Sequence, residues 1–191
     1  MESSQHRICL ALLGLLAFCS PASPFPTGAP LKVCESMRPL HNGVSAQTTT
    51  SPHTIMVRNT SSSMEVKIMG PVYGGILLQA REPGYATAIG NWSTPPQNTK
   101  AIKCFNMANS AITHSSNAAK NANTTYIWNP PTNCVKKVII VATVAQNRET
   151  YWLNLQSEDI NFTCSGAVKC MSGYGVLATF MVWSLLLYSE Q

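Results

Sequence analysis

Apolar residues in the middle of the chain recur at the spacing of β-strands. Met64, Val66 and Ile68 alternate with charged residues, and an alternation of period two is typical of a strand with one buried face. Two continuous apolar runs, 75–80 and 138–144, have the length of strands buried on both faces. The second run is rich in β-branched residues, which also favours a strand.

Turn-forming residues separate these strand candidates. Clusters of Pro, Asn, Ser and Gly occupy residues 93–99 and 129–133, and the Ala/Asn/Ser-rich stretch 106–123 fits a strand plus loop. Many short strands without a long helical period predict an all-β protein, an antiparallel β-sandwich. Further strand candidates are 151–155 and, with weaker patterns, 55–57, 111–113 and 124–128.

The beginning of the chain has the features of a secretory signal peptide. Arg7 precedes an uncharged apolar run over residues 8–18, which suits a signal core and is too short to span a bilayer. Small residues at Ser20 and Ala22 follow it. We therefore expect cleavage after Ala22, so that residues 1–22 are absent from the mature protein.

The end of the chain carries a second apolar run, residues 175–188. It is shorter than the about 20 residues that a spanning helix needs. The small triplet that starts at Ser165 and a short polar spacer precede it, in the order of a glycosylphosphatidylinositol (GPI) anchor signal. We expect a domain over 23–165 and a hydrophobic tail over 166–191, with Ser165 as the candidate lipid-attachment residue. A short membrane span and a secreted tail or buried strand remain alternatives.

Seven cysteines become an even set after this trimming. Removing residues 1–22 takes away Cys9 and Cys19, and cutting after Ser165 takes away Cys170. An even number is expected in a secreted domain, where disulfides persist. Four cysteines allow three pairings, and their spacing does not choose among them. The four that remain are Cys34, Cys104, Cys134 and Cys164.

The charge content argues against several classes of function. Charged residues make up 11% of the chain, less than half of the usual about 25%, and the net charge of +5 comes from scarce acids rather than a basic block. Nucleic acid is therefore not an expected partner. The chain has no paired acid/base motif, phosphate loop, nucleophile elbow or close Cys/His spacing. We expect no catalytic, cofactor-binding or metal-binding residues and no enzyme activity.

Single residues carry a few further expectations. His41 and His114 are expected to be hydrogen-bonded structural residues, and Trp128 and Trp152 to belong to the core rather than to a sugar-stacking surface. Trp92 lies in a glycosylation sequon within a turn-rich segment, so we expect it to be exposed. Four sequons in a secreted chain predict surface N-glycosylation. Their asparagines are Asn59, Asn91, Asn123 and Asn161.

An ordered series of motifs over residues 25–157 resembles the reeler domain. This module is named from reelin and found in F-spondin, ferric-chelate-reductase-like proteins and small insect defence proteins. The resemblance implies an immunoglobulin-like β-sandwich and the pairings Cys34–Cys104 and Cys134–Cys164. One departure is Ile76, where the family usually has an aromatic residue. The motifs are FPTGAPLKVCESMRPLHNGVSAQ (25–47), YGGILLQAR (73–81), THS (113–115), WNPP (128–131), VATVAQ (141–146) and YWLNLQS (151–157).

The resemblance also implies a function outside the cell. Small stand-alone members of the family have a similar size and are associated with antimicrobial response. We therefore expect an extracellular, non-enzymatic binding protein, secreted or anchored at the membrane, that recognises microbial surface glycans or lipopolysaccharide. The alternative is cell-surface adhesion or binding of extracellular matrix. Ferric reduction is rejected, because it needs a haem-bearing module of several membrane spans, for which this chain has no room.

Overall fold

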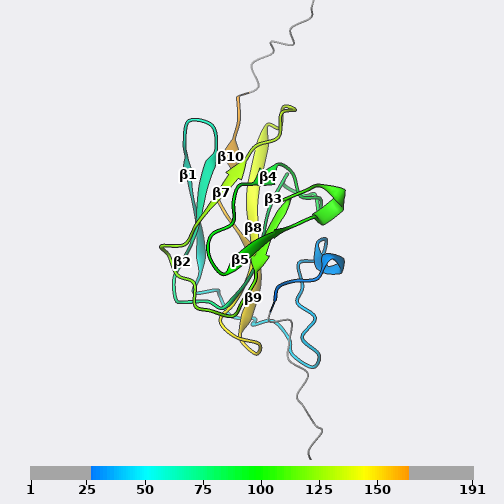
Figure 1. The fold of residues 1–191 in the computed structure, drawn as a ribbon, viewed down its shortest axis with the longest axis vertical. Coiled ribbons are helices and arrows are strands. Elements are labelled where there is room, and N and C mark those ends of the chain that lie inside the picture. Colours follow the sequence, from blue (N-terminus) through cyan, green and yellow to red (C-terminus); the bar gives the residue numbers. More distant parts are fainter. Residues whose placement is uncertain (1–26, 164–191) are drawn as a thin grey trace, which may run out of the picture.

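The computed structural model describes residues 27–163, which form two antiparallel β-sheets (Figure 1). One sheet contains β1 (Thr54–Asn59), β2 (Met64–Met69), β4 (Asn91–Trp92) and β7 (Thr125–Asn129). The other contains β3 (Gly75–Arg81), β5 (Thr99–Ile102), β6 (Ala111–His114), β8 (Lys137–Ala145), β9 (Tyr151–Gln156) and β10 (Ile160–Asn161). Two short 3-10 helices, η2 (Leu31–Val33) and η3 (Cys104–Asn106), lie outside the sheets.

The strand order is that of a β-sandwich, as the sequence predicts. The four-stranded sheet has the order β1-β2-β7-β4, and the six-stranded sheet has the order β10-β8-β3-β6-β5, with β9 also paired to β8. In β2 the residues of the alternating pattern, Met64, Val66 and Ile68, are buried and face the other sheet. The alternation of period two therefore has the expected physical cause, one face in the core and one in solvent.

The two long apolar runs form the centre of the six-stranded sheet. β3 and β8 pair from Gly75 opposite Ala145 to Arg81 opposite Ile139. One face of this pair packs on the four-stranded sheet, and residues 28–41 cover part of the other face with a second, smaller apolar core. Both strands are therefore buried on both faces, which is why their apolar residues run together.

The prediction that Trp92 is exposed is wrong. Its side chain is 2% exposed and belongs to the core between the sheets, whereas Asn91 beside it is exposed. Trp92 lies opposite Trp128 in the pairing of β4 with β7. Adjacent strand residues point to opposite faces, so a sequon asparagine in solvent places the next residue inside. Trp128 and Trp152 are buried, as predicted.

Several expectations concern residues outside 27–163. The signal peptide 1–22, the tail 166–191, Ser165, Cys164 and Cys170 all lie outside the described residues. Within 27–163, no helix is long and apolar enough to cross a bilayer.

Candidate ligand groove under the N-terminal segment

The N-terminal segment, residues 28–41, lies on the outer face of the six-stranded sheet. A disulfide joins Cys34 of this segment to Cys104, with the two Cα atoms 5.6 Å apart. This is one of the two pairings that the family resemblance implies. Cys134 is also disulfide-bonded. Its pairing with Cys164, which lies outside the described residues, stays a prediction.

Buried polar side chains of β3 hold the segment from below. The amide nitrogen of Gln79 donates a hydrogen bond to the carbonyl oxygen of Cys34 at 3.0 Å. The guanidinium of Arg81 donates to the same oxygen at 2.8 Å, to the carbonyl oxygen of Glu35 at 3.0 Å and to the side-chain oxygen of Gln79 at 2.9 Å. Burial lowers the pKa of Arg81, and the negative charge of Glu35 opposes this effect.

Two threonines hold the segment at further points. The hydroxyl of Thr143 on β8 donates to the carbonyl oxygen of Met37 at 2.6 Å. The hydroxyl of Thr113 on β6 accepts from the backbone N–H of Ala29 at 2.9 Å. Gly28 lies so close to β6 that a Cβ atom on it would be 2.3 Å from the carbonyl oxygen of His114. Its φ of +109° also favours glycine.

A groove opens where the segment leaves the sheet. It consists of an apolar hollow beneath the segment and a polar hollow beside the β8–β9 hairpin, with about 460 and 590 Å³ of space including their open mouths. The two hollows adjoin, because both are lined by His41, Gly75, His114 and Ala145. We call this whole space the ligand groove. The apolar hollow is also lined by Ala29, Pro30, Val33, Pro39, Leu40 and Ile76, and the polar hollow by Asn117, Gln146, Asn147 and Arg148.

Both predicted structural histidines line the ligand groove. The Nδ1 atom of His41 lies 2.8 Å from the carbonyl oxygen of Arg148, and its ring meets Tyr151 edge-on at 5.3 Å. The backbone N–H of Ile76 donates to Nδ1 of His114 at 3.3 Å. Both histidines are therefore hydrogen-bonded, as predicted. Their position in the groove could not be found from two isolated histidines far apart in the sequence.

A buried lysine fixes one side of the polar hollow. The ammonium group of Lys120 donates to three backbone carbonyl oxygens, those of Gly74, Ser116 and Ala118, at 2.8, 3.0 and 2.9 Å. Burial lowers the pKa of this lysine. Its hydrogen bonds hold the loop that carries Asn117 against the start of β3. Lys120 was not identified from the sequence, where it is one lysine in a loop without periodicity.

Among the described residues that line the groove, Arg148 is the one arginine or lysine. One of its terminal nitrogens donates to the carbonyl oxygen of Asn42 at 3.4 Å. Among residues 27–163, its Nε atom is buried without a hydrogen-bond acceptor. No aspartate or glutamate lies among the described lining residues, so the groove combines an apolar floor with a cationic side.

The structure changes the expectations for sugar stacking. Trp92, Trp128 and Trp152 are all buried, so none of them offers a ring face to a ligand. Among the described residues, the exposed large aromatic side chain is Tyr85, at 69%. The described residues also contain no group of three His, Cys, Asp or Glu side chains placed to hold a metal ion. The sequon asparagines Asn59, Asn91, Asn123 and Asn161 are all exposed, and their glycosylation stays a prediction.

Comparisons with known proteins agree on one family. Residues 32–167 match the family model described as "Reeler domain". The "Putative defense protein 3" of Antheraea mylitta is 31% identical over 157 residues, which cover 78% of this chain and 93% of that protein. The "Putative ferric-chelate reductase 1 homolog" of Drosophila melanogaster is 29% identical over 173 residues, 84% of this chain but 26% of that protein. The chain therefore spans about a quarter of that relative's length.

A solved structure shows the same fold. The human F-spondin reeler domain (fragment 1) superposes with a TM-score of 0.50 and 14% identity, covering 63% of this chain and 95% of that one.

Proposed function

This chain belongs to the reeler-domain family, and from that premise we propose that it is an extracellular, non-enzymatic binding protein of innate defence. Its targets in this proposal are components of microbial surfaces, glycans or lipopolysaccharide. The ligand groove is the binding site.

The observation that carries the proposal is the extent of the match to the Antheraea mylitta protein. The similarity runs over 93% of that relative, at 31% identity. In the Drosophila melanogaster relative, by contrast, the shared region is 26% of the protein. The activity in that relative's name belongs to a much longer chain, so we do not extend it to this one.

Two features of the structure support an extracellular binding role. A disulfide, Cys34–Cys104, links the N-terminal segment to η3, between β5 and β6, and such bonds persist in oxidising compartments outside the cytosol. The groove that this arrangement creates offers apolar contacts, amide and imidazole groups and one guanidinium. A concave apolar site with a few convergent polar groups is typical of small-ligand binding.

The test is retention of the purified protein on microbial surfaces. Bacterial cells and immobilised lipopolysaccharide are compared with mammalian matrix proteins at about 0.15 M salt, where weak long-range charge attraction is screened. The proposal predicts retention on the microbial surfaces. Retention on matrix proteins alone would contradict it and favour adhesion instead.

A further inference from the structure

We propose that the ligand groove binds a single short acyl chain with an anionic head group. The chain lies in the apolar hollow, and the head group lies in the polar hollow against Arg148. This inference deepens the proposed function, because acylated anionic molecules are one chemical class within the microbial components named above.

The apolar hollow suits an aliphatic chain. Its lining is formed mostly by aliphatic side chains and prolines, among them Val33, Leu40 and Leu77. Leu40 is 38% exposed at its rim, so apolar surface remains in contact with water until a ligand covers it. Burial of each methylene group in such a site is favourable. The favourable free energy therefore grows with the length of the chain that the hollow admits.

Gly75 keeps the floor of the groove open. It lies where the two hollows meet, and a Cβ atom on it would be 3.1 Å from the Cβ of Ala145 and 3.7 Å from Cε1 of His114. A side chain at position 75 would therefore occupy part of the groove and lie against Ala145 and His114. A larger residue at position 75 would fill the groove where the two hollows meet.

The polar hollow suits an anion. Arg148 supplies a guanidinium, whose planar set of donors matches a carboxylate or phosphate. Among residues 27–163 its Nε–H is buried without an acceptor, and an unsatisfied buried donor is unfavourable. An anionic head group in the polar hollow would give the guanidinium an acceptor of opposite charge. The lining residues described bring no aspartate or glutamate to compete for the guanidinium.

The groove is also clear of three of the four sequons. β8 runs from Lys137 to Ala145, so its two ends are about 27 Å apart. The groove lies at the Ala145 end, whereas Asn161 pairs with Lys137 at the other end. Asn59 lines a cleft together with Ile160, and Asn91 pairs with Asn129 next to the Pro130 turn. Glycans at these three asparagines would leave the groove accessible.

Titration calorimetry of the purified protein with decanoate tests this assignment. We expect one site, with decyltrimethylammonium, which has the same chain but a cationic head, failing to bind. Gly75→Val fills the floor and is expected to abolish decanoate binding. Arg148→Gln is expected to weaken it by about tenfold or more, because a hydrogen bond to a charged group is lost. Lys136→Gln, the same change of charge at the far end of the sandwich, is the control and is expected to bind like the wild type.

Each outcome decides for or against the groove. Equal affinity in wild type, Gly75→Val and Arg148→Gln, or no decanoate binding by the wild type, would overturn the inference. Thermal unfolding of each variant is measured in parallel. If Gly75→Val does not fold, the decanoate affinities of Arg148→Gln and Arg148→Lys test the inference instead. The lysine variant keeps a positive charge and is expected to retain part of the affinity.

A further arm replaces decanoate with decyl phosphate, to separate phosphate-headed chains from free fatty acid. Retention on bacteria without decanoate or decyl phosphate binding leaves the proposed function standing and removes this inference. Decanoate binding without retention on bacteria supports this inference and contradicts the proposed function.

Discussion

Four polar side chains of the six-stranded sheet determine where the N-terminal segment lies. Gln79, Arg81, Thr113 and Thr143 are buried, and all four hydrogen-bond to backbone groups of residues 28–41. Since a buried polar group without a partner is costly, these residues define one position for the segment. By fixing the segment, these residues also fix the wall that it contributes to the ligand groove.

Arg81 makes the largest number of these hydrogen bonds, so its loss should be measurable. We expect Arg81→Met to lower the free energy of unfolding by about 2–3 kcal/mol, because two backbone carbonyl oxygens and the Gln79 side chain lose a charged donor. Urea denaturation measures this. Lys100→Met, an exposed cation on β5, is the control. A loss as small as that of the control would show that Arg81 does not hold the segment.

His53 makes stability depend on pH. It is buried against Tyr73 and Trp152, and burial lowers its pKa below the ordinary 6.5, while a hydrogen bond to the Pro71 carbonyl opposes this. The unfolded chain therefore binds the proton more readily. The His53 contribution to the free energy of unfolding is present above pH 6.5, falls as the pH drops through that value and levels off below the folded-state pKa.

Thermal unfolding at about pH 7.5 and about pH 5 brackets the ordinary histidine pKa and measures this effect. We expect the midpoint of the wild type to fall more on acidification than that of His53→Gln, which cannot titrate. The same fall in both proteins would assign the pH dependence to other groups.

At the scale of elements, the long strands follow from the sequence, whereas three of the short strands, β4, β5 and β10, do not. The patterns at 64–68, 75–80 and 138–144 correspond to β2, β3 and β8. β4 and β10 contain two residues each and β5 contains four, which is too short for a period to emerge. Tertiary pairing rather than local pattern defines them, and this is why the position of Trp92 was predicted wrongly.

The ligand groove was beyond sequence reasoning for a related physical reason. Its walls come from the segment 28–41, the start of β3, the end of β6 and the β8–β9 hairpin. These are separated by long stretches of chain, and their approach depends on the packing of the sheet. The polar residues within the apolar β3 and β8 runs were the available signal, because such residues indicate that another segment covers that face.

The Cys34–Cys104 disulfide fastens the N-terminal segment as one element. It closes a loop with a sequence separation of 70, and the chain-entropy model gives about 4 kcal/mol for a loop of that size. We expect the double variant Cys34→Ala/Cys104→Ala to have a free energy of unfolding lower by about 4 kcal/mol. Amide hydrogen exchange should become faster in residues 29–41 while β2 and β7 stay protected. Uniform loss of protection would mean that the segment is not a separate element.

Peptide mapping without reduction tests both disulfides directly. We expect one peptide linking Cys34 to Cys104 and another linking Cys134 to Cys164. A peptide linking Cys34 to Cys134 would contradict both the structure and the pairing that the family implies.

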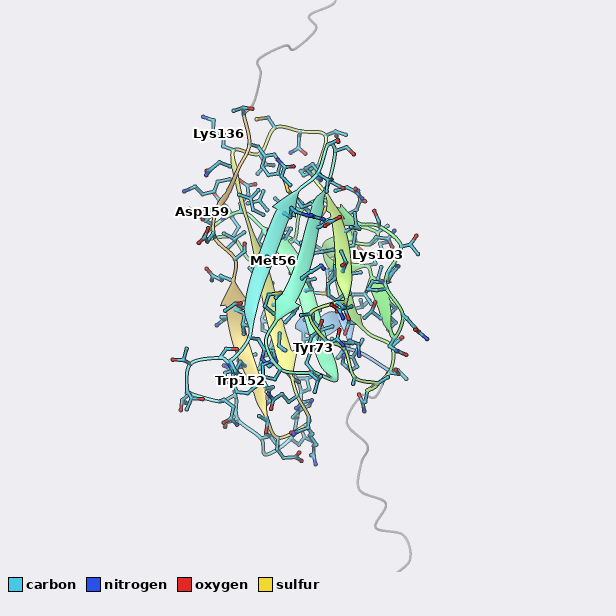
Figure 2. All side chains as sticks on the ribbon, turned by 90° about the vertical axis from the view of Figure 1, so that its left-hand side faces the viewer. Met56, Tyr73, Lys103, Lys136, Trp152 and Asp159 are labelled. Carbon is cyan, nitrogen blue, oxygen red and sulfur yellow. A yellow bond between two sulfur atoms is a disulfide. The ribbon has the colours of Figure 1, made fainter. Side chains whose placement is uncertain are left out.

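At the scale of the whole molecule, the groove and the C-terminal end of the described chain lie at opposite ends of the sandwich. Phe162 hydrogen-bonds to Lys136, and Figure 2 shows Lys136 toward one end and Tyr73 and Trp152 toward the other. A lipid anchor at Ser165 would therefore hold the groove away from the membrane. Such an orientation suits a protein that binds particles arriving from outside.

Release from the cell surface tests this anchor. We expect phosphatidylinositol-specific phospholipase C to shed the protein from expressing cells, with a mature C-terminal peptide ending near Ser165. The untreated cells are the control. A membrane-bound chain that still contains Trp183 would contradict the anchor and favour a short span.

The proposed binding of microbial surfaces through the ligand groove can be tested on bacterial cells. The most direct measurement compares retention on bacterial cells between the wild type and Gly75→Val, with thermal unfolding confirming that both are folded. Ala86→Val, on an exposed loop, controls for the added side chain. We predict that the wild type and Ala86→Val are retained and that Gly75→Val is not. Equal retention of folded wild type and folded Gly75→Val would contradict the account.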